Sequence, residues 1–337
     1  MITELRMGAS FAWAGRHASC HSHKWTIYKS GDPDDREALR EGLMSREIER
    51  FQTPGNIEDA ILLVVSAGVS DFIQNTVASI ERSGASDYMI CIALPQDALA
   101  EVRTAVSRWV NVKYVFLEDI CRADYSLIHE YHEYGTDLFG RFTASKWPAV
   151  RFLLDSGFRR VTYTDVDIAW MKNPMPLLKA ALQTYDVAIQ TEGCDVFPPV
   201  YCTGFMSFRN STFTIELLHE LERTYPELIK TKQQADDQSI FNSVIAGSED
   251  IIHRVFGLSE QLFANGLMAG AIASHEDQSE EVVLRRIDAM IFHANWTIGL
   301  ENKRLLLART GNWLIDQNGN EVPSSHRKLA AGGNLAG

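Results

Sequence analysis

Short apolar segments alternate with helix-like stretches through the middle of the chain. Residues 61–65 (ILLVV), 88–94 (YMICIAL) and 112–117 (VKYVFL) have the length of strands, and helix-like stretches that reach Ser83 and Val110 follow the first two. This spacing predicts βαβ units, and therefore an α/β fold with a mostly parallel central sheet and helices on both faces. Ligands of such sheets bind beyond the carboxyl ends of the strands.

The carboxyl ends of two predicted strands carry candidate ligand-binding residues. Ser66 and Ala67 follow the first strand, and Asp165 and Asp167 come just after a further strand at 160–164 (RVTYT). If the strand continued, both aspartates would lie on one side of it, where like charges repel. They could cap the following turn, but two carboxylates around a single apolar residue are better explained by a bound divalent cation.

The two ends of the chain lack this regular pattern. Residues 1–57 include a His-rich stretch (HASCHSH) and a turn-like segment, so we expect a partly irregular N-terminal extension. The His and Cys spacing in that stretch matches no structural zinc pattern. Residues 316–337 are polar and Gly-rich, which predicts a flexible C-terminal tail. The regular domain is therefore expected over 58–315.

Composition and charge narrow the class of protein. With 45% hydrophobic and 23% charged residues among 337, the chain is typical of a soluble globular protein with a sizeable core. A net charge of -12 without any Lys/Arg run argues against a nucleic-acid partner. No segment reaches the roughly 18 apolar residues of a membrane span, and the N-terminus lacks a secretory signal pattern. These features, with five scattered cysteines, predict a cytoplasmic protein.

An ordered series of motifs extends beyond the two aspartates. In chain order these are TASKWPAVRFLLDSGF (143–158), TDVDIAWMKNP (164–174), TGFMSFRNS (203–211), DDQSIFN (236–242), LFANG (262–266), HANWTIGLENK (293–303) and GNW (311–313). With this series, the chain from Ile61 to Trp313 resembles the nucleotide-diphospho-sugar transferase family, which are glycosyltransferases of the Rossmann-like GT-A fold. The resemblance implies that 58–315 is a GT-A glycosyltransferase domain.

The resemblance also implies a reaction and a set of site residues. The reaction is metal-dependent transfer of a sugar from a nucleoside diphosphate, with a UDP-sugar as the favoured donor, to a hydroxyl of a glycan or protein, with retention of configuration. A mixed carboxylate and imidazole ligand set favours Mn²⁺, with Mg²⁺ possible. With the strand-end residues Ser66 and Ala67 added, the expected site residues are, for the metal, Asp165, Asp167 and His293; for the donor, Ser66, Ala67, Lys146, Asp165, Gly299 and Lys303; for catalysis, Asp237 and Gln238; and on the acceptor side, Thr203 and Gly204.

Other interpretations stay open at this point. A non-catalytic nucleotide-sugar-binding or interaction protein would keep the fold without the chemistry. A metal-dependent nucleotidyltransferase would need a Gly-rich phosphate loop after its first strand, where SAGVSDF (66–72) offers one glycine. Individual side chains have structural alternatives too: a core histidine for His293, a solvated helix lysine for Lys303, a surface charge for Lys146, and a helix N-cap for Asp236 or Asp237.

Overall fold

The computed structural model describes residues 58–121, 132, 134–192, 199–231, 236–276, 278–316 and 319–322. All of them belong to one unit, Phe51–Gly337. The extension expected over 1–57, with its His-rich stretch, and residues 323–337 of the expected tail lie outside the described residues, so those boundaries stay predictions.

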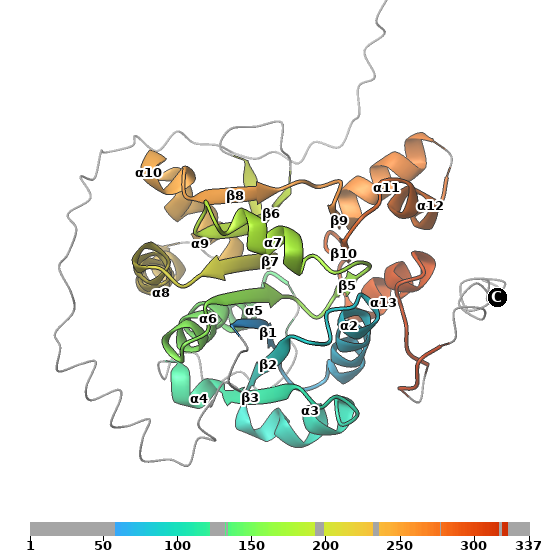
Figure 1. Cartoon of the computed structure of the whole chain (residues 1–337), viewed down its shortest axis with the longest axis horizontal. Helices are drawn as coiled ribbons and strands as arrows, with labels where there is room; N and C mark the ends of the chain where they lie inside the picture. Colours follow the sequence, from blue (N-terminus) through green and yellow to red (C-terminus); the bar gives the residue numbers. More distant parts are fainter. Residues whose placement is uncertain are drawn as a thin grey trace, which may run out of the picture. The chain divides into compact units, whose positions relative to one another are not determined.

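A seven-stranded sheet organises the described part of the chain (Figure 1). Only β7 runs against its neighbours: it is antiparallel to β4 and β6, whereas the other neighbouring pairs are parallel. The α/β fold with a mostly parallel central sheet is therefore confirmed. In spatial order the strands are β3 (Val112–Phe116), β2 (Met89–Leu94), β1 (Asp59–Val64), β4 (Arg160–Thr164), β7 (Val200–Arg209), β6 (Val187–Glu192) and β8 (Val255–Leu258).

Burial on both faces of the sheet explains why its strands are continuous apolar segments. Along β1, Ala60 and Leu62 belong to one hydrophobic cluster, and Ile61 and Leu63 belong to another. The first cluster includes residues of α6 (Lys146–Asp155), α8 (Thr212–Thr231) and α9 (Asp237–Ala246). The second includes residues of α2 (Ser70–Arg82), α3 (Leu99–Ala105) and α7 (Met175–Ala181). Helices thus cover both faces, as predicted.

A three-stranded sheet lies beyond the aspartate pair. Its order is β5 (Ile168–Trp170), β10 (Ile291–His293) and β9 (Phe263–Asn265), with β10 antiparallel to β5 and parallel to β9. A third hydrophobic cluster joins this sheet to residues of α2, α11 (Gly266–His275), α12 (Glu280–Arg286) and α13 (Leu300–Arg309). This small sheet brings the chain around residue 293 next to the loop after β4.

The remaining elements are short. They are η1 (Gln96–Ala98), α4 (Leu117–Ile120), α5 (Asp137–Ala144) and α10 (Glu249–Ile252). The helix expected to reach Val110 ends at Ala105. Val106 has a non-helical backbone conformation, and its side chain is buried although it lies in the turn that follows the helix. Among the helices that the structure describes, none combines the length and the apolar character that a bilayer crossing requires.

Candidate active site

The two aspartates lie in a tight loop between β4 and β5. The strand ends at Thr164, so the aspartates do not share one face of an extended strand. The backbone N–H of Asp165 donates to the carbonyl of Gly204 on β7 at 2.8 Å. From α2, the Thr76 hydroxyl donates to the carbonyl of Val166 at 2.5 Å. These bonds fasten the backbone of the loop to β7 and to α2.

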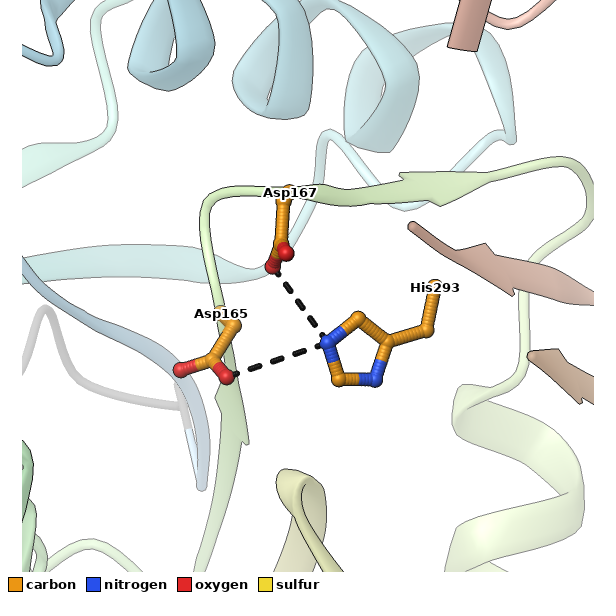
Figure 2. Close-up of side chains that lie close together, drawn as sticks. All are labelled: Asp165, Asp167 and His293. Atoms are coloured by element: carbon orange, nitrogen blue, oxygen red, sulfur yellow. Dashed lines mark ion pairs between the residues drawn. The ribbon is translucent and has the colours of Figure 1, made fainter. Parts of the chain in front are cut away.

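Asp165, Asp167 and His293 converge on one position. The Nε2 atom of His293 lies 3.4 Å from Asp167 Oδ1 and 3.9 Å from Asp165 Oδ2. One ligand atom from each of the three side chains lies within 4.8 Å of the others. Figure 2 shows the imidazole, which comes from β10, directed at both carboxylates. Residues far apart in sequence therefore lie together as the motifs predict, and could hold a metal ion.

A neighbouring amide fixes the orientation of the histidine ring. Gln190, at the end of β6, donates through Nε2 to the carbonyl of Phe263 at 2.9 Å. Its Oε1 therefore faces His293 Nδ1, at 3.0 Å, and accepts the proton of that nitrogen. In the neutral ring, Nε2 is then left as a lone-pair donor aimed at two carboxylates. A cation between these three groups satisfies all of them.

The two carboxylates differ in their electrostatic surroundings. Lys303 Nζ lies 2.6 Å from Asp167 Oδ2. Burial alone would raise the pKa of Asp167, but the charge of Lys303 overcomes it and holds the pKa well below the ordinary value. Burial and the charge of Asp167 raise the pKa of Asp165 in spite of Lys146. Asp167 is therefore the more firmly ionised of the pair.

A second lysine–aspartate pair lies beside this cluster. Lys146 Nζ is 2.7 Å from Asp237 Oδ2 and 3.7 Å from Asp165 Oδ1, and it donates to the Thr203 carbonyl at 3.2 Å. The Thr203 hydroxyl donates to Asp237 as well. Lys146 is only 1% exposed, so the surface-charge interpretation of this lysine is wrong. The pair connects a predicted catalytic residue to the predicted metal ligands.

The structure separates the two neighbouring aspartates at the start of α9. Asp236 caps the helix, since its side chain accepts the backbone N–H of Ser239 at 2.7 Å. Asp237 turns inward and is 4% exposed. Burial would raise the pKa of Asp237, but Lys146 lowers it below the ordinary value. The capping role that the sequence left open for either residue thus belongs to Asp236.

Gly204 lets β7 pass directly under the cluster. A Cβ atom built on it would lie 2.3 Å from His293 Cε1 and 2.8 Å from Asp165 Oδ2. Both distances are far inside van der Waals contact. Any larger residue would displace two of the three candidate ligands, which gives Gly204 a packing role next to its predicted place on the acceptor side.

Three predicted donor residues lie outside this network. Gly299, directly before α13, has φ +86°, and this backbone conformation favours glycine. Ser66 and Ala67 follow β1, and the Ser66 hydroxyl contacts the Ala67 carbonyl at 3.4 Å. Within the described ranges, no hydrogen bond or ion pair links these two residues to Asp165 or Asp167. Their part in donor binding stays a prediction.

Sequence reasoning missed Gln190 and Glu192 at the end of β6. Both are buried, and Glu192 accepts hydrogen bonds from the amides of Gln238, at 3.2 Å, and Asn295. A signal was available, since the apolar strand VAI ends in the polar run QTE at its carboxyl end. The same reasoning that singled out the aspartate pair applies to this run.

Comparison with known proteins gives consistent results. A profile of the family described as nucleotide-diphospho-sugar transferase matches residues 92–307. In Arabidopsis thaliana, UDP-D-xylose:L-fucose alpha-1,3-D-xylosyltransferase 1 is 24% identical over 95% of this chain and 86% of its own. UDP-D-xylose:L-fucose alpha-1,3-D-xylosyltransferase MGP4 from the same plant is 23% identical over 78% of this chain and 72% of its own.

Solved structures support the fold. The galactosyltransferase LgtC, in complex with donor and acceptor sugar analogues, superposes with a TM-score of 0.50 at 11% identity, covering 82% of this chain and 96% of that one. An active-site mutant of LgtC gives a TM-score of 0.53 at 10% identity with the same coverage. Since the family profile spans more than half of the sequence, the chain belongs to the nucleotide-diphospho-sugar transferase family and is a nucleotide-sugar glycosyltransferase.

Proposed function

We propose that this glycosyltransferase uses a divalent metal ion and a UDP-sugar, and that it transfers the sugar with retention of configuration to a hydroxyl of a glycan or protein. The observation that carries the proposal is the convergence of Asp165, Asp167 and His293 Nε2 within 4.8 Å. Lys303 and the Lys146–Asp237 pair surround this cluster. The arrangement matches the needs of a departing diphosphate.

The three side chains fit a divalent cation. Two carboxylates and one imidazole are a ligand set that suits Mn²⁺, and Mg²⁺ is possible. A bound cation would act as a Lewis acid and stabilise the negative charge of the leaving diphosphate. Gln190 holds His293 in the tautomer with its lone pair on Nε2, which is the form that coordinates a metal.

Lys303 is placed to exchange one anion for another. Its ammonium group pairs with Asp167 at 2.6 Å, and its side chain is 25% exposed, so it can turn toward an incoming ligand. A lysine acts as a point charge on phosphate. We infer that Lys303 moves from Asp167 to the donor diphosphate as the carboxylate turns to the cation.

Retention follows most simply from attack on the face that the leaving group vacates. The acceptor oxygen forms a bond to the anomeric carbon as the bond from that carbon to the phosphate oxygen breaks. The hydroxyl proton passes to the departing phosphate oxygen, so the step needs no external base. Asp237 would hydrogen-bond donor-sugar hydroxyls, Gln238 would face the anomeric centre, and Thr203 with Gly204 would border the acceptor.

The donor and acceptor classes are proposed from the relatives. Both Arabidopsis proteins are named as enzymes that use UDP-D-xylose and L-fucose, which supports a UDP-sugar donor and a carbohydrate acceptor here. UDP-xylose is accordingly the first donor to test, followed by other UDP-sugars.

Thermal shift and turnover together test the proposal. A panel of UDP-sugars with Mn²⁺ should raise the melting temperature, because a ligand that binds only the folded state stabilises it. Donor hydrolysis and transfer should disappear with EDTA and return when Mn²⁺ is restored. Equal turnover with and without chelator would contradict the metal mechanism, and no shift with any UDP-sugar would contradict the donor class.

A further inference from the structure

Glu192 is a buried carboxylate at the candidate site that none of the sequence motifs includes. It ends β6 and is 9% exposed. Since β7 is antiparallel to both β4 and β6, these two strands run in the same direction. Glu192 therefore lies at the same edge of the sheet as Asp165 and Asp167, where ligands of such sheets bind.

Two amide side chains share the Glu192 carboxylate. Gln238 donates through Nε2 to Glu192 Oε2 at 3.2 Å, and Asn295 donates through Nδ2 to Glu192 Oε1. The Oδ1 atom of Asn295 accepts the backbone N–H of Gly266 at 3.2 Å, so this amide is fixed at both ends. Asn295 stands two residues after His293, which ties Glu192 to the metal cluster through a short piece of chain.

The backbone of Gln238 is held separately from its side chain. Asn242 Nδ2 donates to the Gln238 carbonyl at 2.8 Å and to the Tyr201 carbonyl at 2.8 Å, and Asn242 Oδ1 accepts the Tyr201 backbone N–H at 2.9 Å. The first turn of α9 is thus fastened to β7. These bonds do not fix the side-chain amide of Gln238, which could still rotate. The hydrogen bond to Glu192 restricts that rotation.

We propose that Glu192 is a positioning residue for transfer: it fixes the Gln238 amide so that the amide oxygen, and not the NH₂ group, is presented to the reacting sugar. A carboxylate can only accept hydrogen bonds, whereas an amide has one accepting and one donating end. The NH₂ group of Gln238 is therefore held at Glu192, and Oε1 is the end turned away from it. This inference rests on the proposed place of Gln238 at the anomeric centre.

The orientation matters because the reacting carbon gains positive charge as the phosphate departs. An amide oxygen carries partial negative charge and stabilises that carbon, whereas a flipped amide would present partial positive charge to it. Fixed dipoles aimed at developing charge stabilise the transition state without having to reorganise during the reaction. Gln190 and Glu192 thus have the same kind of role. Gln190 binds His293 Nδ1 and so leaves Nε2 as the free acceptor, and Glu192 binds the NH₂ group of Gln238 and so leaves Oε1 as the free acceptor.

Kinetics of four variants test the proposal: Glu192→Ala, Glu192→Gln, Gln238→Ala and the double variant Glu192→Ala/Gln238→Ala. The assay is hydrolysis and transfer with the UDP-sugar that wild-type enzyme turns over fastest. We expect Glu192→Ala to lower kcat by about 10-fold or more, with KM for the donor within about 2-fold, because orientation acts in the transition state. Glu192→Gln, which can still accept from Gln238, should restore part of kcat.

The double variant carries the sharpest result. If Glu192 acts through Gln238, the double variant should be no slower than Gln238→Ala alone, since coupled residues are not additive. Multiplicative losses, an effect on KM without one on kcat, or an unchanged kcat in Glu192→Ala would each overturn the proposal.

A matched control separates positioning from general stability. Glu222, on α8, is a partly buried carboxylate that accepts from Arg151 at 2.7 Å, away from the cluster. Glu222→Ala should lower the midpoint of urea unfolding and leave kcat unchanged. Isothermal titration with UDP and Mn²⁺ should give the same affinity for wild type and Glu192→Ala. A wild-type enzyme that turns over no UDP-sugar would overturn the proposed function together with this inference, whereas active wild type with an unaffected Glu192→Ala overturns this inference alone.

Discussion

Two lysine–aspartate pairs of nearly equal length flank the candidate metal ligands, and they differ in burial. Lys303 lies 2.6 Å from Asp167, and the two side chains are 25% and 8% exposed, so the difference in burial is that of the lysine. Lys146 lies 2.7 Å from Asp237, and the two side chains are 2% and 6% exposed. Lys146 also donates to a backbone carbonyl and lies 4.4 Å from the centre of the Tyr163 ring.

Because of this difference, we expect the Lys303–Asp167 contact to be replaceable and the Lys146–Asp237 contact to be fixed. Lys303 is the partly exposed partner of its pair, so water can solvate its ammonium group when it leaves Asp167, and a bound cation would compensate the buried carboxylate that stays behind. Removing one partner of a buried pair costs about 3–5 kcal/mol, because a charge stays behind without compensation. We infer that Lys303 serves the ligand and that Lys146 serves the framework that holds Asp237 and Asp165.

The largest effect is expected at Asp167, the carboxylate that pairs with Lys303 and is a proposed metal ligand. Asp167→Ala should lower transfer by about 1,000-fold or more, since Lewis-acid stabilisation of a leaving group is worth several kcal/mol. The fold should persist, because the substitution also removes repulsion with Asp165. Steady-state transfer and the melting temperature without ligand measure the two parts. Substantial turnover by this variant would contradict the assignment of Asp167 as metal ligand.

Disrupting the buried Lys146–Asp237 pair should mainly lower the stability of the fold. Lys146→Met should lower the free energy of unfolding by about 3 kcal/mol, because Asp237 is left buried beside an apolar side chain. The double variant Lys146→Met/Asp237→Leu should recover much of that loss, since both buried charges are then gone. Urea unfolding without metal or nucleotide measures both. A loss below about 1 kcal/mol in Lys146→Met would make the two pairs alike and break the comparison.

Disrupting the Lys303–Asp167 pair, whose lysine is partly exposed, should mainly lower catalysis. Lys303→Met should lower kcat/KM by about 30-fold, which corresponds to the loss of one charge-assisted hydrogen bond of about 2 kcal/mol. With Mn²⁺ present, so that a bound cation would compensate Asp167, its free energy of unfolding should stay within about 1 kcal/mol of wild type. Lys179→Met, at an exposed lysine of α7, is the control and should change neither quantity. A stability loss equal to that of Lys146→Met would show that Lys303 is part of the framework.

The fold and the aspartate pair could be predicted from local signals. Strand β4 is predicted over 160–164 and is observed there, with Val161 and Tyr163 buried in one hydrophobic cluster and Thr162 and Thr164 buried as well. Asp165 and Asp167 stand out because charge follows an apolar strand. His293 and Lys303 were assigned through the family resemblance, and the structure brings both to Asp167.

What could not be predicted depends on contacts between distant segments. Lys146 is buried because α6 packs on β1 and β4 and the lysine reaches the Thr203 carbonyl of β7, and no local pattern distinguishes a buried helix lysine from an exposed one. Gln190 and Glu192 form hydrogen bonds with His293 and Asn295, each 103 residues away in sequence, and Glu192 also with Gln238, 46 residues away. Asp236 and Asp237 are adjacent, and only the direction in which the chain enters α9 decides which one caps the helix.

The smallest expected effect is the pH dependence of the buried pair, and it tests whether the Lys146–Asp237 contact is electrostatic. Lys146 holds the pKa of Asp237 below its ordinary value although burial would raise it. A lowered folded-state pKa contributes stability above the unfolded value, about 3.9, which is lost as pH falls through the folded pKa. Asp165, which also faces Lys146, should shift the balance in the same direction, because its ionised form too loses a compensating charge in Lys146→Met.

The difference in unfolding free energy between wild type and Lys146→Met should therefore shrink by about 1 kcal/mol between pH 6 and pH 3. Urea unfolding at each pH, with EDTA present, measures it. The pKa of Asp186 is lowered by hydrogen bonds from Arg209 and Ser211 in spite of burial, so the stability that Asp186 contributes is also lost in acid. That loss occurs equally in both proteins and cancels in the difference. A difference that stays constant over this range would mean that the aliphatic stem of Lys146, and not its charge, supports the site.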